Sequence, residues 1–143
     1  MMVSTRGRYA LRVMIDIAEH TTGKYITLKE IANRQEISEK YLESILPALT
    51  KAGFIDGLRG KGGGYKLSRL PECFTVGSVL KLVEGGFAPV ACLESNPVKC
   101  GRAGECRTLP MWKKFQEMTD EFFEGITIAD LCEQRQGCSD YVI

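Results

Sequence analysis

The chain has 143 residues, 44% of them hydrophobic, and a formal net charge of +1. This length suits one domain, or one small domain with an appended arm. No apolar run approaches the roughly 20 residues that span a bilayer. Charged residues interrupt the apolar N-terminal segment, so we expect no signal peptide, no membrane partner and a cytoplasmic location. In that compartment, the six cysteines are more typical of thiols or metal ligands than of disulfides.

Charge is distributed unevenly along the chain. Residues 1–69 contain 12 lysines and arginines against 7 acidic residues, whereas residues 91–143 contain 6 against 9. A basic first half favours an anionic partner such as nucleic acid, although ordinary solvated charge explains it equally well.

Three helices are predicted before residue 53. The first begins behind Ser4 or Thr5 and repeats apolar residues at helical spacing. The second, shorter helix opens with a capping box of Thr27 and Glu30.

The third helix begins behind Ser38 and ends at Gly53. Pro47 lies within it, where the missing N–H and the ring predict a kink or a break. Only "RQEIS" separates it from the second helix, which indicates the steep crossing of a helix-turn-helix. Its buried stripe is formed by Leu42, Ile45, Leu46 and Leu49.

A hairpin with a glycine-rich tip follows in "FIDGLRGKGGGYKLSR". Beside a helix-turn-helix such a hairpin is typical of a wing, and its glycines allow close approach to a phosphate chain. Its cations are Arg59, Lys61, Lys66 and Arg69. No helix follows the glycines directly, which argues against a nucleotide-binding loop.

Helices are also predicted in the second half. One lies between Thr75 and Gly85, one between Pro110 and Gly125, and a last short one begins behind Thr127. The middle helix carries a stripe that fits either a dimer interface or an intrachain core, and its members are Met111, Trp112, Phe115, Met118 and Phe122.

Three cysteines, Cys92, Cys100 and Cys106, are clustered among turn-forming residues just before the helix at residue 110. Nearby cations and the helix N-terminus favour thiolates, and three soft ligands suit an iron–sulfur cluster or zinc. The spacing lacks a Cys-x-x-Cys pair, which places zinc second. A redox-active thiol loop and chance clustering are the remaining interpretations.

The other cysteines and the single histidine are interpreted as structural. Cys73 and Cys132 are expected to be small buried hydrophobes. Cys138, in the C-terminal tail, is a candidate free thiol or mobile ligand. His20 ends the first helix, where a cation interacts well with the dipole.

Four features together resemble the Rrf2 family of winged-helix transcription regulators: "STRGRYAL", "SEKYLESIL", "RGKGGGYKL", and a three-cysteine loop running into "MW". The pattern is most similar to the IscR branch, the iron–sulfur cluster regulators. The resemblance implies a mainly α fold, with a winged helix-turn-helix, a two-stranded wing and a long C-terminal dimerisation helix. The expected regions are 1–70 for DNA binding, 71–90 for a connecting helix, 91–108 for the cysteine loop, and 109–143 for the dimerisation helix and tail.

The resemblance also implies a homodimer that binds double-stranded promoter DNA. The third helix would enter the major groove, Arg59 would enter the minor groove, and the N-terminal residues would contact the DNA backbone. The implied DNA-binding residues are Thr5, Arg6, Arg8, Ser38, Lys40, Tyr41, Glu43, Ser44, Arg59, Gly60, Lys61, Gly62, Gly63, Gly64 and Tyr65.

By the same resemblance, Cys92, Cys100 and Cys106 ligate a 2Fe–2S or 4Fe–4S cluster, which we expect to be lost on aerobic purification. In the IscR branch the fourth ligand is a histidine three residues after the last cysteine, and Leu109 stands at that position here. In another branch a carboxylate at the start of the first helix reaches the cluster from the partner chain, and Arg8 stands at that position.

The implied function is a repressor that senses redox state, nitric oxide or iron–sulfur status. The alternative is a regulator of cysteine or sulfur metabolism without a cluster, controlled by thiols or by a protein partner such as cysteine synthase. An enzyme is not expected, because the chain offers no nucleophile–base pair.

Overall fold

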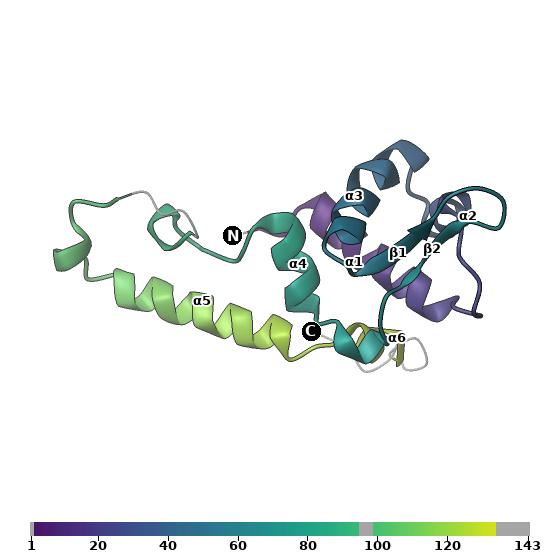
Figure 1. Cartoon of the computed structure of the whole chain (residues 1–143). Helices are drawn as coiled ribbons and strands as arrows, with labels where there is room; N and C mark the ends of the chain where they lie inside the picture. Colours follow the sequence, from purple (N-terminus) through teal and green to yellow (C-terminus); the bar gives the residue numbers. More distant parts are fainter. Residues whose placement is uncertain (1, 95–98, 134–143) are drawn as a thin grey trace.

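The computed structural model describes residues 2–94 and 99–133, so Cys138 and the rest of the tail lie outside the described residues. The fold is mainly helical with one two-stranded antiparallel sheet, as predicted (Figure 1). In chain order the elements are α1 (Thr5–Glu19), α2 (Leu28–Gln35), α3 (Glu39–Lys51), β1 (Ile55–Leu58), β2 (Gly64–Leu67), η1 (Pro71–Cys73), α4 (Val76–Glu84), η2 (Ala91–Leu93), η3 (Ala103–Glu105), α5 (Leu109–Glu124) and α6 (Ile128–Glu133).

Side-chain caps fix where the first helices begin. Ser4, rather than Thr5, caps α1 and accepts the backbone N–H three residues on, at 3.1 Å. The predicted capping box of α2 is present: Thr27 accepts the Glu30 N–H at 3.1 Å, and the Glu30 carboxylate accepts the Thr27 N–H at 2.7 Å. Ser38 caps α3 in the same way as Ser4 caps α1. Local sequence therefore determines these three starts.

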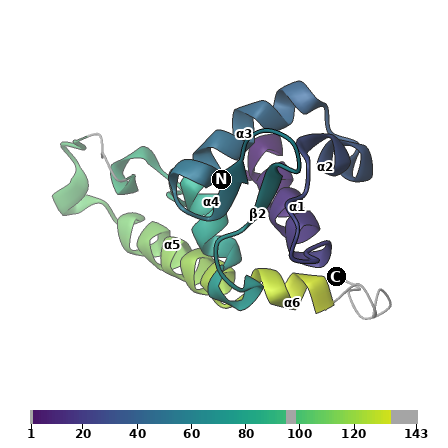
Figure 2. The same cartoon turned by 45° about the vertical axis from the view of Figure 1, so that its right-hand side comes forward.

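The core surrounds α1, which contacts α2, α3, α4, α6 and the wing strand β2 (Figures 1 and 2). One apolar cluster joins the winged helix-turn-helix to α4 and α6, and a smaller one holds the base of α5. The fully buried side chains of the main cluster include Val13, Met14, Ile17, Ile31, Leu42, Ile45, Leu46, Leu49, Ile55, Phe74 and Ile128.

The main exception to this apolar interior is Asp16 of α1, a completely buried carboxylate. The Arg34 guanidinium of α2 binds both of its oxygens, at 3.0 and 2.8 Å, and the Gln35 amide donates to one of them at 2.8 Å. The hydrogen bond to Asp16 raises the pKa of Arg34. Arg12 donates to the side chain and the carbonyl of Gln35, which extends the network along α1.

The turn between α2 and α3 is tight. It contains Glu36 in the left-handed conformation at φ 53°, which side chains other than glycine adopt at a cost. Beyond it, α3 runs through Pro47 without a break, so of the kink or break that the proline predicts, the break is absent. Pro47 and the Glu43 carbonyl that it leaves unbonded are on the exposed face, while the opposite face is anchored in the core.

The predicted wing is formed by β1 and β2, paired antiparallel with Ile55 opposite Leu67 and Leu58 opposite Gly64. Tyr65 also exchanges backbone hydrogen bonds with Ile26, at 2.7 and 2.8 Å, so the segment before α2 joins the hairpin. The wing is thereby attached to the helix-turn-helix at its base.

Glycine is required at the wing positions for two different structural reasons. Gly60 and Gly62 have φ of 91° and 76° in open space, which a turn requires. A side chain at Gly63 would collide with the Leu58 carbonyl, and one at Gly64 with the Ile26 carbonyl. The hairpin's own backbone therefore requires Gly63 and Gly64, independently of any ligand.

The second half leaves the core through α4. The long helix α5 begins away from the body, beside the cysteine-bearing segment, and runs back so that its C-terminal end lies beside α4 and α6 (Figure 1). No residue of α5 is buried. No helix among the described residues is long and apolar enough to cross a membrane.

The structure revises one of the minor residue assignments. Cys73, expected to be buried, is exposed at the end of η1, because Phe74 occupies the core position there. Cys132 is half-buried against the main core, in line with the expectation. His20 is the C-cap of α1, and its Nδ1 lies 2.8 Å from the Asp16 carbonyl oxygen.

The Asp16–Arg34 pair yields an asymmetric prediction. Arg34→Ala leaves the buried carboxylate without its counter-charge and should lower the free energy of unfolding by about 3–5 kcal/mol. Asp16→Ala should cost less, roughly 1–2 kcal/mol, because Arg34 is 31% exposed and its charge can reach water. Urea denaturation followed by circular dichroism measures both, and a larger loss for Asp16→Ala would contradict this account.

Candidate nucleic-acid interface and cysteine-lined cavity

The outer face of α3 presents polar side chains on its first two turns. Ser38, Lys40, Glu43 and Ser44 are all exposed there, as predicted for a helix that reads bases. Tyr41 differs: it is half-buried, and its ring packs edge-on against Tyr9 of α1 at 5.2 Å. Its ring is therefore mainly a packing contact between α1 and α3.

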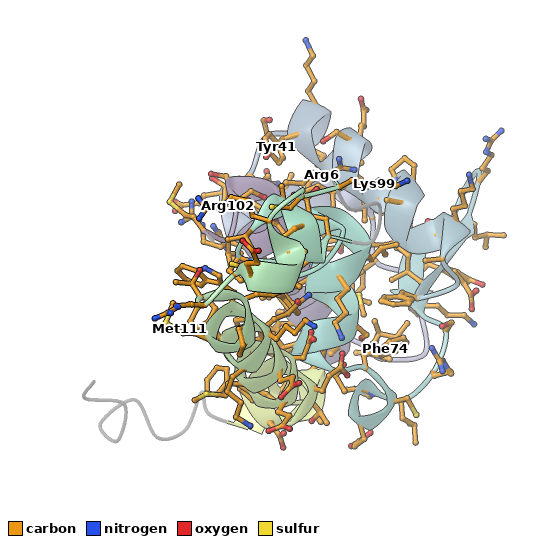
Figure 3. The ribbon with its side chains drawn as sticks, turned by 90° about the vertical axis from the view of Figure 1, so that its left-hand side faces the viewer. Arg6, Tyr41, Phe74, Lys99, Arg102 and Met111 are labelled. Atoms are coloured by element: carbon orange, nitrogen blue, oxygen red, sulfur yellow. The ribbon has the colours of Figure 1, made fainter. Side chains whose placement is uncertain are left out.

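The N-terminus of α1 lies against the same helix. The Arg6 guanidinium donates to the Ser44 carbonyl oxygen at 3.1 Å, and Arg6 lies on the same side of the molecule as Tyr41 (Figure 3). Arg8 donates to the Thr5 hydroxyl at 2.9 Å. All three N-terminal residues are exposed, but Arg6 also ties α1 to α3.

The four cations of the wing region fall into two pairs. The ammonium group of Lys66 lies over the Tyr25 ring at 4.9 Å, and the guanidinium of Arg69 lies over the Phe74 ring at 4.8 Å. Arg59 and Lys61, beside the tip, are exposed and form no ion pair within the described part of the chain. These two are the charges positioned to meet a partner.

A cavity of about 450 Å³ separates the end of α3 from the wing. Thr50 and Lys51 of α3 line it together with Arg59. Sequence reasoning did not assign Thr50 or Lys51 to this surface, because only the folded hairpin brings them beside Arg59. An exposed helix beside a flexible basic hairpin can place a helix in the major groove, about 12 Å wide, and a side chain in a neighbouring groove.

Four large apolar side chains of α5 are exposed along one face. Met111, Phe115, Met118 and Phe122 are 53, 44, 58 and 64% accessible. Figure 3, which views α5 nearly end-on, places Met111 on the side away from Phe74 and the core. Trp112, expected in the same stripe, is half-buried. The other side of the helix base packs inward, with Phe123 against Phe87 at 5.0 Å.

The three cysteines of the loop line one cavity of about 570 Å³ at the N-terminal end of α5. Cys92 comes from η2, Cys100 from the segment that follows, and Cys106 from the end of η3. The sequence predicts three thiolates that converge on one centre, whereas the structure places them around one cavity whose remaining lining the sequence does not indicate. The other lining residues are Leu93, Lys99, Gly101, Ala103, Leu109 and Lys113.

Cys106 has the environment of a reactive thiol. Its Sγ lies 3.4 Å from the Thr108 hydroxyl, and this hydrogen bond is the main reason why the pKa of Cys106 is lowered. The backbone N–H groups of Thr108 and Leu109 and the charge of Arg102 act in the same direction.

As a donor set, the cavity fits three thiolate ligands, and Lys99 and Lys113 would offset their charge. Within residues 2–94 and 99–133, however, no three His, Cys, Asp or Glu side chains are close enough to hold a single metal ion. Leu109, at the position where the resemblance places a fourth ligand, lines this cavity with an apolar side chain.

Comparisons with known proteins agree with this geometry. Residues 3–134 match the profile of the Rrf2 family, described as an iron-dependent transcriptional regulator. The protein rrf2 of Nitratidesulfovibrio vulgaris is 38% identical over 138 residues, which cover 96% of this chain and 91% of that protein.

Two solved structures have a similar fold. That of CymR, described as the global cysteine regulator of B. subtilis, has a TM-score of 0.74 at 30% identity and covers 93% of this chain and 97% of its own. That of IscR from T. potens has a TM-score of 0.76 at 31% identity and covers 100% and 94%.

Proposed function

The chain belongs to the Rrf2 family of transcriptional regulators, and we propose that it is a homodimeric repressor that senses redox state, nitric oxide or iron–sulfur status at its three-cysteine cavity. The observation that carries the sensing role is that Cys92, Cys100 and Cys106 line a single cavity. A repressor must reach the chromosome, so a cytoplasmic location is part of the proposal.

For DNA, the proposal assigns base reading to α3 and groove insertion to the wing. The exposed Lys40 and Glu43 have different roles: the cation attracts phosphate, while the carboxylate repels phosphate and accepts a hydrogen bond from cytosine N4. Arg59 is assigned to the minor groove, and Lys61 to a phosphate. The backbone of Gly60 to Gly64 would follow the phosphate chain, with Thr5 and Arg8 as further backbone contacts.

Changes in the wing test this assignment. Arg59→Ala should lower the affinity for the specific duplex by roughly 1–3 kcal/mol and affect random duplex much less. Lys61→Ala should weaken binding to both duplexes about equally and flatten the salt dependence, because it removes only a phosphate contact. Fluorescence anisotropy on both duplexes at several salt concentrations measures this, and equal, small effects of the two changes would contradict the assignment.

For dimerisation, the proposal assigns the exposed face of α5 to the interface between two copies. Met111, Phe115, Met118 and Phe122 are spaced by four, three and four residues, the heptad pattern of paired helices. All four side chains are exposed in the single chain and together form one apolar stripe, whereas a monomer's surface usually carries only scattered apolar residues. A twofold dimer would place two reading helices on the half-sites of a palindrome.

Disrupting this face should separate the copies. Phe115→Glu or Phe122→Glu should give monomer, because each places an unpaired charge in the proposed apolar interface. Specific DNA affinity should fall with it, since the half-sites are no longer read together. Thr119→Glu, on a half-buried position outside the stripe, is the matched control. Light scattering measures the mass, and an intact dimer in both phenylalanine variants would show that α5 does not form the interface.

For sensing, the proposal assigns Cys92, Cys100 and Cys106 as thiolate ligands of a 2Fe–2S or 4Fe–4S cluster, which when bound supplies an iron centre that oxidants and nitric oxide attack. The iron-dependent character of the family and the lowered pKa of Cys106 support this assignment. The apolar Leu109 supplies no fourth donor, so a weakly held position would leave the iron accessible. Such a centre would be lost on aerobic purification.

The second candidate is a regulator of cysteine or sulfur metabolism controlled by its thiols or by a partner protein such as cysteine synthase. Two observations favour it: no three ligands converge in the described part of the chain, and the CymR structure is as similar as that of IscR. In this case Cys106 would act as the responsive thiol.

One spectrum separates the two candidates. Anaerobically purified protein should be brown, with visible absorption that disappears in Cys92→Ala, Cys100→Ala and Cys106→Ala but persists in Cys73→Ala, whose thiol lies outside the cavity. Cys138→Ala then tests whether the tail contributes a ligand. Zinc, or no metal at all, in the anaerobic protein would exclude the cluster and leave the thiol- or partner-controlled regulator.

A further inference from the structure

The N-terminus of α1 is held by a carboxylate from the far end of α4. Glu84, the last residue of α4, accepts from the Ser4 backbone N–H at 3.0 Å and from the Ser4 hydroxyl at 2.5 Å. A side chain at the buried Gly7 would collide with the Glu84 carboxylate. Glycine at this position therefore leaves the room that Glu84 needs beside the first turn of α1.

The same arrangement occurs a second time, between α5 and α4. Glu124, the last residue of α5, accepts from the hydroxyl of Thr75, the N-cap of α4, at 2.8 Å. A side chain at Gly77 would collide with Glu124. Lys81 reinforces this contact at 3.1 Å, and the hydrogen bond from Thr75 lowers the pKa of Glu124.

Both contacts place a negative charge where helix N-terminal N–H groups carry a partial positive charge. In each contact, a glutamate at the end of one helix accepts a hydrogen bond from the N-cap hydroxyl of another helix. A glycine in the first turn of that second helix leaves space for the carboxylate. The contacts of Glu124 thereby fix the end of α5 against the start of α4, and the contacts of Glu84 fix the end of α4 against the start of α1.

The chain of contacts continues to the DNA-reading helix. Arg6, two residues after Ser4, donates to the Ser44 carbonyl of α3 at 3.1 Å. At the same end of α4, Glu84 is followed directly by Gly85 and Gly86, at φ 82° and 128°, and then by the segment that carries the three cysteines. Glu84 therefore lies between the cysteine segment and the DNA-reading helix.

We propose that Glu84 is a positioning residue for DNA recognition, which holds the α1 N-terminus, and through Arg6 the helix α3, in a fixed relation to α4. It touches no DNA. Its role rests on the proposed DNA-reading function, which it deepens by connecting the reading helix to α4, the helix that precedes the cysteine-bearing segment. Glu124 fixes α5 to α4 by the same contacts.

The sign of the expected effect separates positioning from plain electrostatics. Removing a negative charge by itself strengthens binding to DNA. We expect Glu84→Ala instead to weaken binding to the specific duplex by roughly tenfold, the usual scale of coupling between sites, while binding to random duplex is unchanged or stronger. Glu84→Gln, which keeps an acceptor oxygen, should give an intermediate loss. Glu72→Gln, which removes an exposed charge in η1, is the matched control and should lower neither affinity.

Amide hydrogen exchange tests the positioning without DNA. In full-length Glu84→Ala, exchange should become faster in residues 4–8 and also in residues 39–44, while residues 28–35 of α2 serve as the internal reference. Arg6→Ala removes a cation and should weaken binding to both duplexes, but it should add little to the loss of preference for the specific duplex in the Glu84→Ala background, because both residues belong to one chain of contacts.

The outcomes are distinct. Unchanged exchange in residues 39–44, or an unchanged preference for the specific duplex in Glu84→Ala, overturns the positioning role. A wild-type protein that shows no preference for any promoter duplex overturns the proposed function instead. In that case the exchange experiment still decides whether Glu84 positions α3.

Discussion

The buried carboxylate of Asp16 is the constraint on which the winged helix-turn-helix depends. Burying a charge at the centre of α1 costs desolvation free energy, which only a well-oriented counter-charge offsets. The guanidinium of Arg34 on α2 is oriented in this way and binds both carboxylate oxygens. Apolar packing alone would let α2 slide or rotate against α1, whereas two directed hydrogen bonds do not. Because the turn at Glu36 is short, fixing α2 also fixes the start of α3. The direction in which α3 points therefore depends on an ion pair between α1 and α2.

The sequence predicts well those features that depend on neighbours along the chain. Helix starts at Ser4, Thr27 and Ser38 follow from N-cap hydroxyls, which Glu30 completes to a capping box at Thr27, and the wing follows from alternating apolar residues around glycines. The clustering of three cysteines in 15 residues likewise predicts that they share a cavity. In each case the chain has little freedom to bring the groups anywhere else.

Contacts between distant segments escape such reasoning. In the sequence, Lys66 and Arg69 read as free charges of the wing. In the structure, their charged groups lie over the rings of Tyr25 and Phe74. Glu84 and Ser4 are 80 positions apart, so nothing in either local pattern indicates that they meet. Tyr41 has the right helical position for reading bases, but the ring of Tyr9 gives it an apolar neighbour. Burial of this kind is a property of the assembled core and cannot be obtained from periodicity.

The glycines of the wing also limit which positions of the hairpin tip can vary in sequence. Gly63 and Gly64 have no room for a side chain, and the positive φ of Gly60 and Gly62 favours only glycine or, less well, asparagine. Most positions of the hairpin tip therefore accept no residue other than glycine without strain. Arg59 and Lys61 remain as the variable positions. If the wing binds DNA as proposed, evolutionary changes of promoter preference are confined to these two residues and the first turns of α3, because the glycines between them cannot vary without distorting the hairpin.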